Sequence, residues 1–504
     1  MSRNISDTLN KMKAAIAGAN GNDAFMKAIT TSLGLVNYDL EAAAKLMFPW
    51  GDKITPLRNE TPRSKSNRGD TAHRWKQING INTTNLPPGV SEGNRGGVVT
   101  TTESDKLSTY AGLGLEDYVT EEARYAAEGF DDVLTLASEN LLKATMISEE
   151  KMIFGGNSSV ALGTPATPTV ANGLTTGGAL SNTTYYVTVV ALTHDGWQRA
   201  TVGAGVVQQI IRTNADGSTD TINGGTSIPS AVGNATLSGG GSTQTLYANT
   251  TAIQGAVAYA WYIGTSAAHQ YLSQITTINS ANITAVPANT FQDAQTLAAA
   301  DYSNVGTYGF SGLLYSGPLN STTSGYYSAL ATGTPGTGTQ LTSDNAGGIK
   351  EFNALLKDRY DNYRLSPDTI WCNSQEINSI KVLVVKNGGA PLVRFVGDIS
   401  SPATNLQAGA IVAFYTNPIT MESIRIRVHP FAAPGTILFT TKESPYAGSR
   451  VSTLVEMLCR QEYYSTLWPM RSRKREYGVY VDETLLMYFP PAFAAITNIA
   501  PTLS

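Results

Sequence analysis

The stretch that decides the fold reads TEEARYAAEGFDDVLTLASENLLKATMISEEKMIF and occupies residues 120–154. Its apolar residues recur every three or four positions, and this period places them in one stripe along a helix. The stripe contains Ala123, Ala126, Ala127, Phe130, Leu134, Ala137, Leu141 and Ala144. Thr120 is the expected N-cap, Gly129 predicts a bend or a close neighbour, and Asn157 follows the two glycines that end the pattern. The pattern predicts one helix about 50 Å long, which can brace an elongated subunit.

Length, charge and cysteine content limit the class of protein. The 504 residues allow two to four domains with ample apolar material for their cores. A formal net charge of −4 excludes a protein that wraps nucleic acid with its whole surface. Two cysteines are too few for a disulfide framework or a thiolate metal site. Because residues 1–13 are polar and no long apolar run occurs, we expect a protein that is made and used without crossing a membrane.

The first hundred residues divide into two parts. Residues 1–54 are expected to form an N-terminal arm of short amphipathic helices that dock on another part of the assembly. Residues 55–105 are polar and rich in cations, namely Arg58, Arg63, Lys65, Arg68, Arg74 and Lys76. Strand-like runs at 71–78 and 97–102 flank proline and glycine breakers, which predicts a long two-stranded hairpin. Such a hairpin buries no core of its own, so we expect a neighbouring subunit to stabilise it.

The composition changes sharply after the predicted helix. Between Met152 and Ile349 the sequence contains no Lys and no Glu. Alternating runs occur at 185–192, 202–211, 257–263 and 271–278, and turn clusters separate them at 194–196, 214–217 and 239–241. In the third run, Val257, Tyr259, Trp261 and Ile263 are expected on one side of a strand. Short strands at such intervals predict an all-β sandwich at about 164–294.

Three segments of this region carry a resemblance. They are TYYVTVVA at 184–191, VAYAWYIG at 257–264 and FQD at 291–293. They resemble immunoglobulin-like or fibronectin type III-like modules of phage structural proteins. The resemblance implies an inserted Ig-like β-sandwich.

Helical spacing returns at Lys350 and gives the chain an α+β character. One helix is expected from Phe352 to a point before Ser366-Pro367, and a second at 375–386. Strands are expected at 369–372, 392–396, 411–415, 424–428 and 436–440. Residues 451–464 are expected to form a long strand or a passage from helix to strand, and residues 477–489 are expected to close the chain.

The motifs of common enzymes are missing from the sequence. It has no phosphate-binding loop, no dinucleotide fingerprint and no zinc-binding His-Glu-x-x-His, so we expect no catalytic, cofactor-binding or metal-binding residue and no enzyme activity. The four histidines, isolated in the sequence, are expected to be structural or surface residues: His73, His194, His269 and His429.

Several charged groups and one cysteine receive structural interpretations. The adjacent acids Asp131-Asp132 and Glu149-Glu150 point about 100° apart on a helix, and we interpret them as solvated. Cys372 is expected to be a small buried apolar residue. A basic run near the end of the chain consists of Arg471, Arg473, Lys474 and Arg475. We expect it to contact nucleic acid or to pair with acids of another subunit.

The order of these parts resembles the major capsid proteins of tailed bacteriophages, which have the Hong Kong 97-type shell fold. The segments that carry the resemblance are 110–115 with 121–154, 310–314, 366–373, 424–428, 434–438 and 476–489. The resemblance implies an N-terminal arm (1–54), an extended hairpin loop (55–105), a peripheral domain with the spine helix (106–160), the inserted Ig-like sandwich (161–300), a peripheral return (301–374), an axial domain (375–440) and a peripheral end (441–504).

The function that the resemblance implies is a structural one. Copies of the chain would form the hexamers and pentamers of an icosahedral head shell, with each hairpin over the next subunit's spine helix. The expected partners are separate scaffolding, portal and decoration proteins and double-stranded DNA on the inner face, with assembly in the host cytoplasm and no membrane. Two alternatives stay open: an encapsulin-type nanocompartment shell, and a phage decoration or adhesion protein that binds glycans through the β module.

Overall fold

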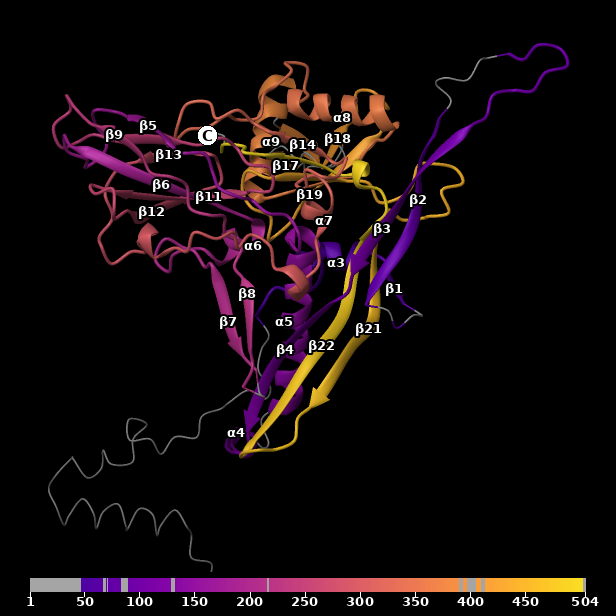
Figure 1. The fold of residues 1–504 in the computed structure, drawn as a ribbon, viewed down its shortest axis with the longest axis horizontal. Helices are drawn as coiled ribbons and strands as arrows, with labels where there is room; N and C mark the ends of the chain where they lie inside the picture. Colours follow the sequence, from indigo (N-terminus) through magenta and orange to yellow (C-terminus); the bar gives the residue numbers. More distant parts are fainter. Residues whose placement is uncertain are drawn as a thin grey trace, which may run out of the picture.

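A computed structural model describes residues 47–66, 69, 71–82, 89–127, 132–214, 217–388, 393–396, 405–408 and 413–501. Figure 1 shows a long narrow limb, a body at one end of the limb, and further sheets beside the body. Helices and strands are mixed along the chain, in agreement with the predicted mixed class. The helices predicted in the N-terminal arm lie outside the described residues.

The limb is a four-stranded sheet. Figure 1 shows a helix along one face of it. Its strands are β1 (Arg63–Lys65), β4 (Ala111–Thr120), β21 (Val455–Leu467) and β22 (Lys474–Met487). They lie in the order β1-β21-β22-β4, and only β1 and β21 are parallel. Helix α5 (Val133–Gly155) packs on the sheet through an apolar cluster that includes Leu141, Val119 and Val479. The limb therefore joins segments from the two ends of the described chain.

The single helix predicted for residues 120–154 is wrong, because two helices occupy this stretch. Helix α4 (Glu121–Ala126) begins at Thr120, whose hydroxyl accepts the N–H of Ala123 at 3.3 Å, as expected. Helix α5 begins after Asp132, whose carboxylate accepts the N–H of Leu134 at 3.2 Å. A capping residue has an extended backbone, so a second cap inside a helical pattern starts a new helix. With 23 residues, α5 is about 35 Å long, and Gly129 lies outside the described residues.

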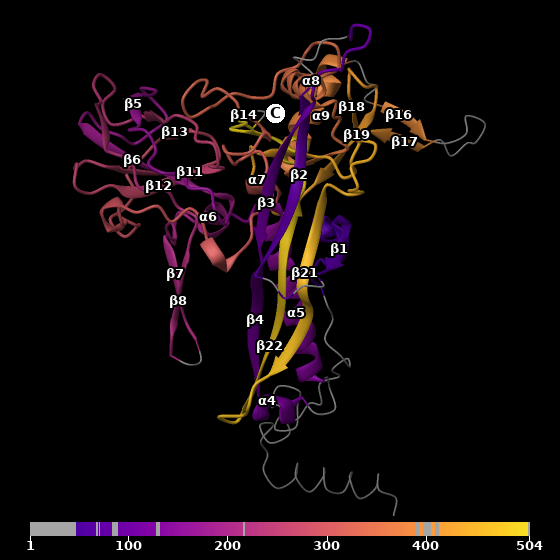
Figure 2. The ribbon, with the colours of Figure 1, turned by 45° about the vertical axis from the view of Figure 1, so that its right-hand side comes forward.

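A two-stranded hairpin leaves the top of the limb (Figure 2). Strands β2 (Ala72–Asn82) and β3 (Thr100–Thr109) pair in antiparallel register, from Ala72 with Thr109 to Asn82 with Thr100. The strands are longer than the sequence pattern predicts. We call β2 and β3 together the hairpin arm.

The body is built around one six-stranded sheet. Its strands are β14 (Tyr326–Ala329), β15 (Thr369–Cys372), β18 (Phe414–Thr416), β19 (Ser423–Val428), β20 (Ile437–Thr440) and β23 (Ala494–Thr497), in the order β14-β23-β20-β15-β19-β18. Helices α8 (Lys350–Tyr363) and α9 (Ser374–Gly388) accompany it, and α8 ends before Ser366-Pro367 as predicted. The prediction that residues 477–489 close the chain is wrong, because β23 follows them and pairs with β20.

Two sheets form the region after α5. One contains β5 (Thr169–Asn172), β10 (Leu246–Asn249) and β13 (Ser280–Ile283); the other contains β6 (Thr184–Leu192), β9 (Gly233–Thr236), β11 (Ala258–Gly264) and β12 (Tyr271–Thr276). Both sheets contribute to one apolar core, for example through Val187, Leu246 and Trp261. Strand β11 is buried on both faces, because Ala260 and Tyr262 enter a second core. The expected placement of Tyr259, Trp261 and Ile263 on one side of the strand is confirmed, since all three enter the first of these cores.

Two further features of this region depart from the sequence pattern. The turn predicted at 194–196 is the start of helix α6 (His194–Arg199), since the Thr193 hydroxyl accepts the N–H of Gly196 at 3.3 Å. The run predicted at 202–211 becomes a strand only at its end, in the hairpin β7 (Gln209–Thr213) and β8 (Thr219–Asn223). Figure 2 shows this hairpin standing apart from the two sheets.

The remaining elements are short. They are η3 (Gly51–Lys53), α3 (Pro56–Glu60), η4 (Ala294–Thr296), η5 (Gly306–Tyr308), α7 (Leu313–Ser316), β16 (Val393–Val396), β17 (Asn405–Ala408) and η6 (Pro490–Ala492).

Candidate assembly surfaces

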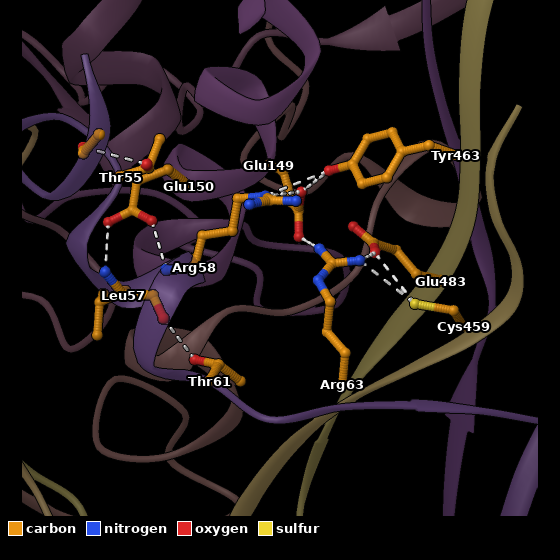
Figure 3. Close-up of polar contacts among 11 residues, drawn as sticks. Thr55, Leu57, Arg58, Thr61, Arg63, Glu149, Glu150, Cys459, Tyr463 and Glu483 are labelled. Carbon is orange, nitrogen blue, oxygen red and sulfur yellow. Dashed lines mark hydrogen bonds and ion pairs between the residues drawn. The ribbon is translucent and has the colours of Figure 1, made fainter. Parts of the chain in front are cut away.

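A buried ion network joins the segment that precedes the hairpin arm to the limb (Figure 3). Its centre is Glu149 on α5, whose side chain is wholly buried. The carboxylate pairs with the guanidinium of Arg58 at 2.8 Å and with that of Arg63, and it accepts the hydroxyl of Tyr463. Both guanidinium groups also lie 5.4 Å from the centre of the Tyr463 ring. Elements α3, β1, α5 and β21 therefore meet at one carboxylate.

A second carboxylate extends the network to β22. Glu483 is buried and pairs with Arg63 at 3.1 Å, while the thiol of Cys459 lies 3.6 Å away. Burial raises the pKa of Glu483, and the nearby Arg63 charge opposes this rise. Burial also raises the pKa of the Cys459 thiol to about 11, which makes it a poor nucleophile at neutral pH. The cluster therefore supports a structural role rather than cysteine chemistry.

Glu150 has its own set of partners on the other side of α5. It accepts the N–H of Leu57 at 2.9 Å, the N–H of Arg58 at 2.7 Å and Nε2 of His429 at 2.8 Å. The interpretation of Glu149 and Glu150 as solvated is therefore wrong. Because adjacent helix residues point in different directions, each acid reaches a separate set of donors. Together the two acids hold residues 57–63 against α5, and so they fix where the chain leaves the limb to form the arm.

One face of the hairpin arm lies against its own chain. The hydroxyl of Ser108 bonds that of Thr484 at 2.7 Å, and Trp75 meets Tyr488 edge to face at 5.6 Å. These contacts hold only the root of the arm.

The other face of the arm is exposed and partly apolar. Ile78 is 65% exposed and Leu107 53% exposed. Arg74 lies opposite Leu107 and Ile78 opposite Glu103 in the register, so apolar and charged side chains share this face. Arg74 forms no ion pair with any residue that the structure describes. These apolar side chains are therefore available for contact with another protein.

The face of the limb sheet opposite α5 carries a pair of tyrosines. Tyr464 and Tyr480 stack with ring centres 5.6 Å apart, and the Tyr480 hydroxyl donates to Glu116. The Tyr480 ring lies over Gly114 and Gly478, where a side-chain carbon would overlap it. We call Glu116, Tyr464 and Tyr480 the tyrosine face.

The far end of the limb combines apolar and basic residues. Leu467, Trp468 and Met470 are exposed there. Two cations of the predicted basic run are paired within the chain, Arg473 with Glu122 and Arg475 with Glu121, each at 2.8 Å. The predicted pairing was with acids of another subunit, whereas these partners lie in the same chain, at the start of a helix about 350 residues away in the sequence.

The histidines and Cys372 lie in varied surroundings. Cys372 is buried as predicted. His269 pairs with Asp293 at 2.7 Å on the surface. His194 and His429 are wholly buried and lie on two sides of Phe154, a proximity that their sequence positions do not reveal.

The described residues contain neither a candidate metal site nor a candidate membrane-spanning helix. No group of three or more His, Cys, Asp or Glu side chains among them is placed to hold a metal ion. In the same part of the chain, no helix is both long and apolar enough to span a membrane.

Comparisons with known proteins give structural neighbours only. No family model matches the chain, and no curated protein matches it. The capsid of a native GTA particle matches with a TM-score of 0.43 and 8% identity, over 94% of this chain and 99% of that chain. The capsid of cyanophage A-1(L) matches with 0.43 and 9%, over 93% and 98%. The SrpI encapsulin of Synechococcus elongatus matches with 0.39 and 9%, over 96% and 97%.

Proposed function

We propose that this chain is the major capsid protein of a tailed phage, which self-assembles into the icosahedral head shell around packaged double-stranded DNA. The observation that carries the proposal is the hairpin arm. Buried ion pairs of Arg58 and Arg63 anchor the segment that leads into the arm, while the outer face of the arm presents exposed apolar side chains that its own body does not cover. A rigid anchor with an uncovered ribbon suits an arm that reaches a neighbouring copy.

We infer that the tyrosine face of a second copy receives the arm. Glu116 is exposed beside two partly exposed aromatic rings, and Arg74 lies beside the exposed Leu107 on the arm. Pairing of Arg74 with Glu116 would fix the position of the arm on the second copy, and the neighbouring apolar and aromatic side chains would supply contact area. This seat differs from the expectation that the arm covers the spine helix of the next subunit, because α5 lies on the opposite face of the same sheet.

The finer layout belongs to the same proposal. We place an Ig-like sandwich at 161–300, an axial domain at 375–440 and peripheral segments at 106–160, 301–374 and 441–504. Hexamers and pentamers, scaffolding, portal and decoration partners, DNA on the inner face and cytoplasmic assembly complete it. We propose no enzyme activity. Many modest contacts, repeated over the shell, would resist internal pressure and still allow wrongly placed subunits to dissociate.

The test replaces two apolar side chains of the arm by acids, in the variant Ile78→Asp with Leu107→Asp. The unassembled variant is expected to keep the wild-type thermal unfolding, because both side chains are exposed. Closed shells are expected to be lost in electron micrographs. The matched control is Ile211→Asp on the β7–β8 hairpin, since Ile211 is 69% exposed, and this variant is expected to assemble.

Three outcomes would change the proposal. Normal shells from the double variant would remove the role of the arm. Wild-type protein that stays a monomer or trimer at every concentration would support the decoration or adhesion alternative. Particles from infected cells that contain an enzyme cargo in place of DNA would support the nanocompartment alternative.

A further inference from the structure

Two buried histidines lie where three parts of the chain meet. His194 begins α6, Phe154 belongs to the last turn of α5, and His429 follows β19. The His429 ring stacks on Phe154 with centres 4.2 Å apart and planes at 14°. The His194 ring lies 5.1 Å from Phe154 at 57°. Both imidazoles are wholly buried, so the stack joins the two-sheet region to the limb and the body.

The backbone of Phe431 contacts both imidazoles. Its N–H lies 3.3 Å from Nδ1 of His429, and its carbonyl oxygen lies 2.7 Å from Nε2 of His194. An N–H only donates, so Nδ1 of His429 must be the bare nitrogen, and the proton on Nε2 is donated to Glu150 at 2.8 Å. A carbonyl only accepts, so Nε2 of His194 carries its proton. The hydrogen bonds therefore select one neutral tautomer for each ring.

Neither ring has room for a second proton. On His429 this proton would sit at Nδ1, directly against the N–H of Phe431. On His194 it would sit at Nδ1, which is buried and has no hydrogen-bond partner among the described residues. Gly155 lies so close to this nitrogen that a side-chain carbon there would overlap the ring. An imidazolium at either position would lose a hydrogen bond or leave a buried donor unpaired.

We propose that the two histidines form an acid-sensitive latch: proton uptake at His194 and His429 detaches α6 from α5 and from the turn at Phe431. The contacts of the latch lie within one chain, so it operates in an unassembled subunit. The latch goes beyond the proposed function, because shell assembly through the arm and the tyrosine face does not require α6 to move.

The direction of the pH effect follows from the surroundings of the rings. The pKa of His194 is lowered to about 3, chiefly by burial and to a lesser extent by the neighbouring His429 and Lys151, while the hydrogen bond to the Phe431 carbonyl opposes this. Burial also lowers the pKa of His429, although Glu150 opposes this. A histidine whose folded pKa is depressed stabilises the docked state above its unfolded pKa of about 6.5, and this contribution is lost as pH falls toward the folded pKa. The window for release therefore opens below about pH 6.5.

The other charged groups around the latch do not reproduce this effect. Burial raises the pKa of Asp195 on α6, so acidification favours its neutral, docked form. Arg199 lies on α6, Lys151 on α5 packs over the Phe431 ring at 5.0 Å, and Arg427 on β19 pairs with Glu60 of α3. None of these cations offers an acceptor to a second imidazole proton.

The experiment measures amide hydrogen exchange of the unassembled full chain at pH 7 and pH 5, corrected for intrinsic exchange rates. The N–H groups of Trp197 and Ala200 bond within α6 to Thr193 and Gly196, so they report whether α6 stays docked. Their protection is expected to fall by about tenfold or more at pH 5, one pKa unit being a factor of ten. Protection in α8, within the body, is expected to stay the same.

Three variants separate a latch from general acid unfolding. His194→Gln with His429→Gln keeps an N–H donor toward Phe431 and Glu150 but does not titrate, so α6 protection is expected to be equal at the two pH values. The surface control His269→Gln is expected to keep the wild-type response. Gly155→Ala displaces the His194 ring, and we expect it to expose α6 already at pH 7, whether or not the double variant folds.

Either of two results would overturn the latch. One is wild-type protection in α6 that is unchanged at pH 5. The other is Gly155→Ala with full α6 protection at pH 7, because the ring would then not need its position beside Gly155.

Discussion

Tyr463 and Tyr464 are neighbours on β21, yet they lie on opposite faces of the limb sheet. On the inner face, Tyr463 donates to Glu149, which is wholly buried among arginines. On the outer face, Tyr464 stacks on Tyr480, which donates to Glu116 near solvent. A phenol therefore pairs with a carboxylate on each face of the same sheet, once in a buried and once in an exposed environment.

The environment decides what each pair contributes. A buried charge that loses its partners destabilises the fold strongly, whereas an exposed pair competes with water and contributes little. The inner pair therefore holds the limb and the root of the arm together. The outer pair leaves its rings and its charge available to another molecule, as an assembly surface requires.

The largest effect is expected from Glu149→Gln. The amide fills the same space but leaves Arg58 and Arg63 without their shared carboxylate. We expect a loss of about 3–5 kcal/mol in the free energy of unfolding, the range for breaking a buried ion pair. Urea unfolding of the unassembled protein measures it. A loss below about 1 kcal/mol would mean that the inner pair behaves as an exposed one.

The helices and strands that carry these two pairs are easier to predict from the sequence than the contacts between them. Periodicity and apolar runs predict a helix on the limb, β6, β11, β15 and α8, because these elements bury a stripe or a full strand. The break before α5 was missed, although Asp132 has the capping chemistry, because the apolar stripe continues through it. Local pattern therefore identifies an element more reliably than its ends.

The buried network could not be predicted from local pattern. Glu149 and Arg58 are 91 residues apart in the sequence, and Glu150 and His429 are 279 apart. Adjacent acids on a helix usually face solvent, and nothing near them in the sequence names a distant partner. The pairing of β1 with β21 and of β21 with β22 brings part of the network together, namely Arg63, Cys459 and Glu483.

An intermediate effect is expected from Gly114→Ala on β4. The added carbon would overlap the Tyr480 ring and separate it from Tyr464, with a loss of about 1–3 kcal/mol as for other overpacked sites. Gly112→Ala, two residues away on the same strand, is the matched control, because its added carbon meets no atom within 4 Å. Thermal unfolding of both variants gives the comparison. Equal losses in the two variants would show that the loss comes from the restricted backbone of the alanine and not from displacement of the Tyr480 ring.

The smallest effect is expected from Glu116→Gln. An exposed pair contributes less than about 1 kcal/mol, so stability should hardly change. The titration of Tyr480 should change, however. Burial raises the pKa of Tyr480, and the hydrogen bond to Glu116 and its negative charge raise it further. Without the negative charge at position 116 the phenol of Tyr480 loses its proton more easily. Tyrosinate absorbance is therefore expected to appear at lower pH than in the wild type. An unchanged titration, together with a large loss of stability, would place Glu116 in the same class as Glu149, and the outer face would then be part of the fixed frame of the limb rather than a surface free to bind.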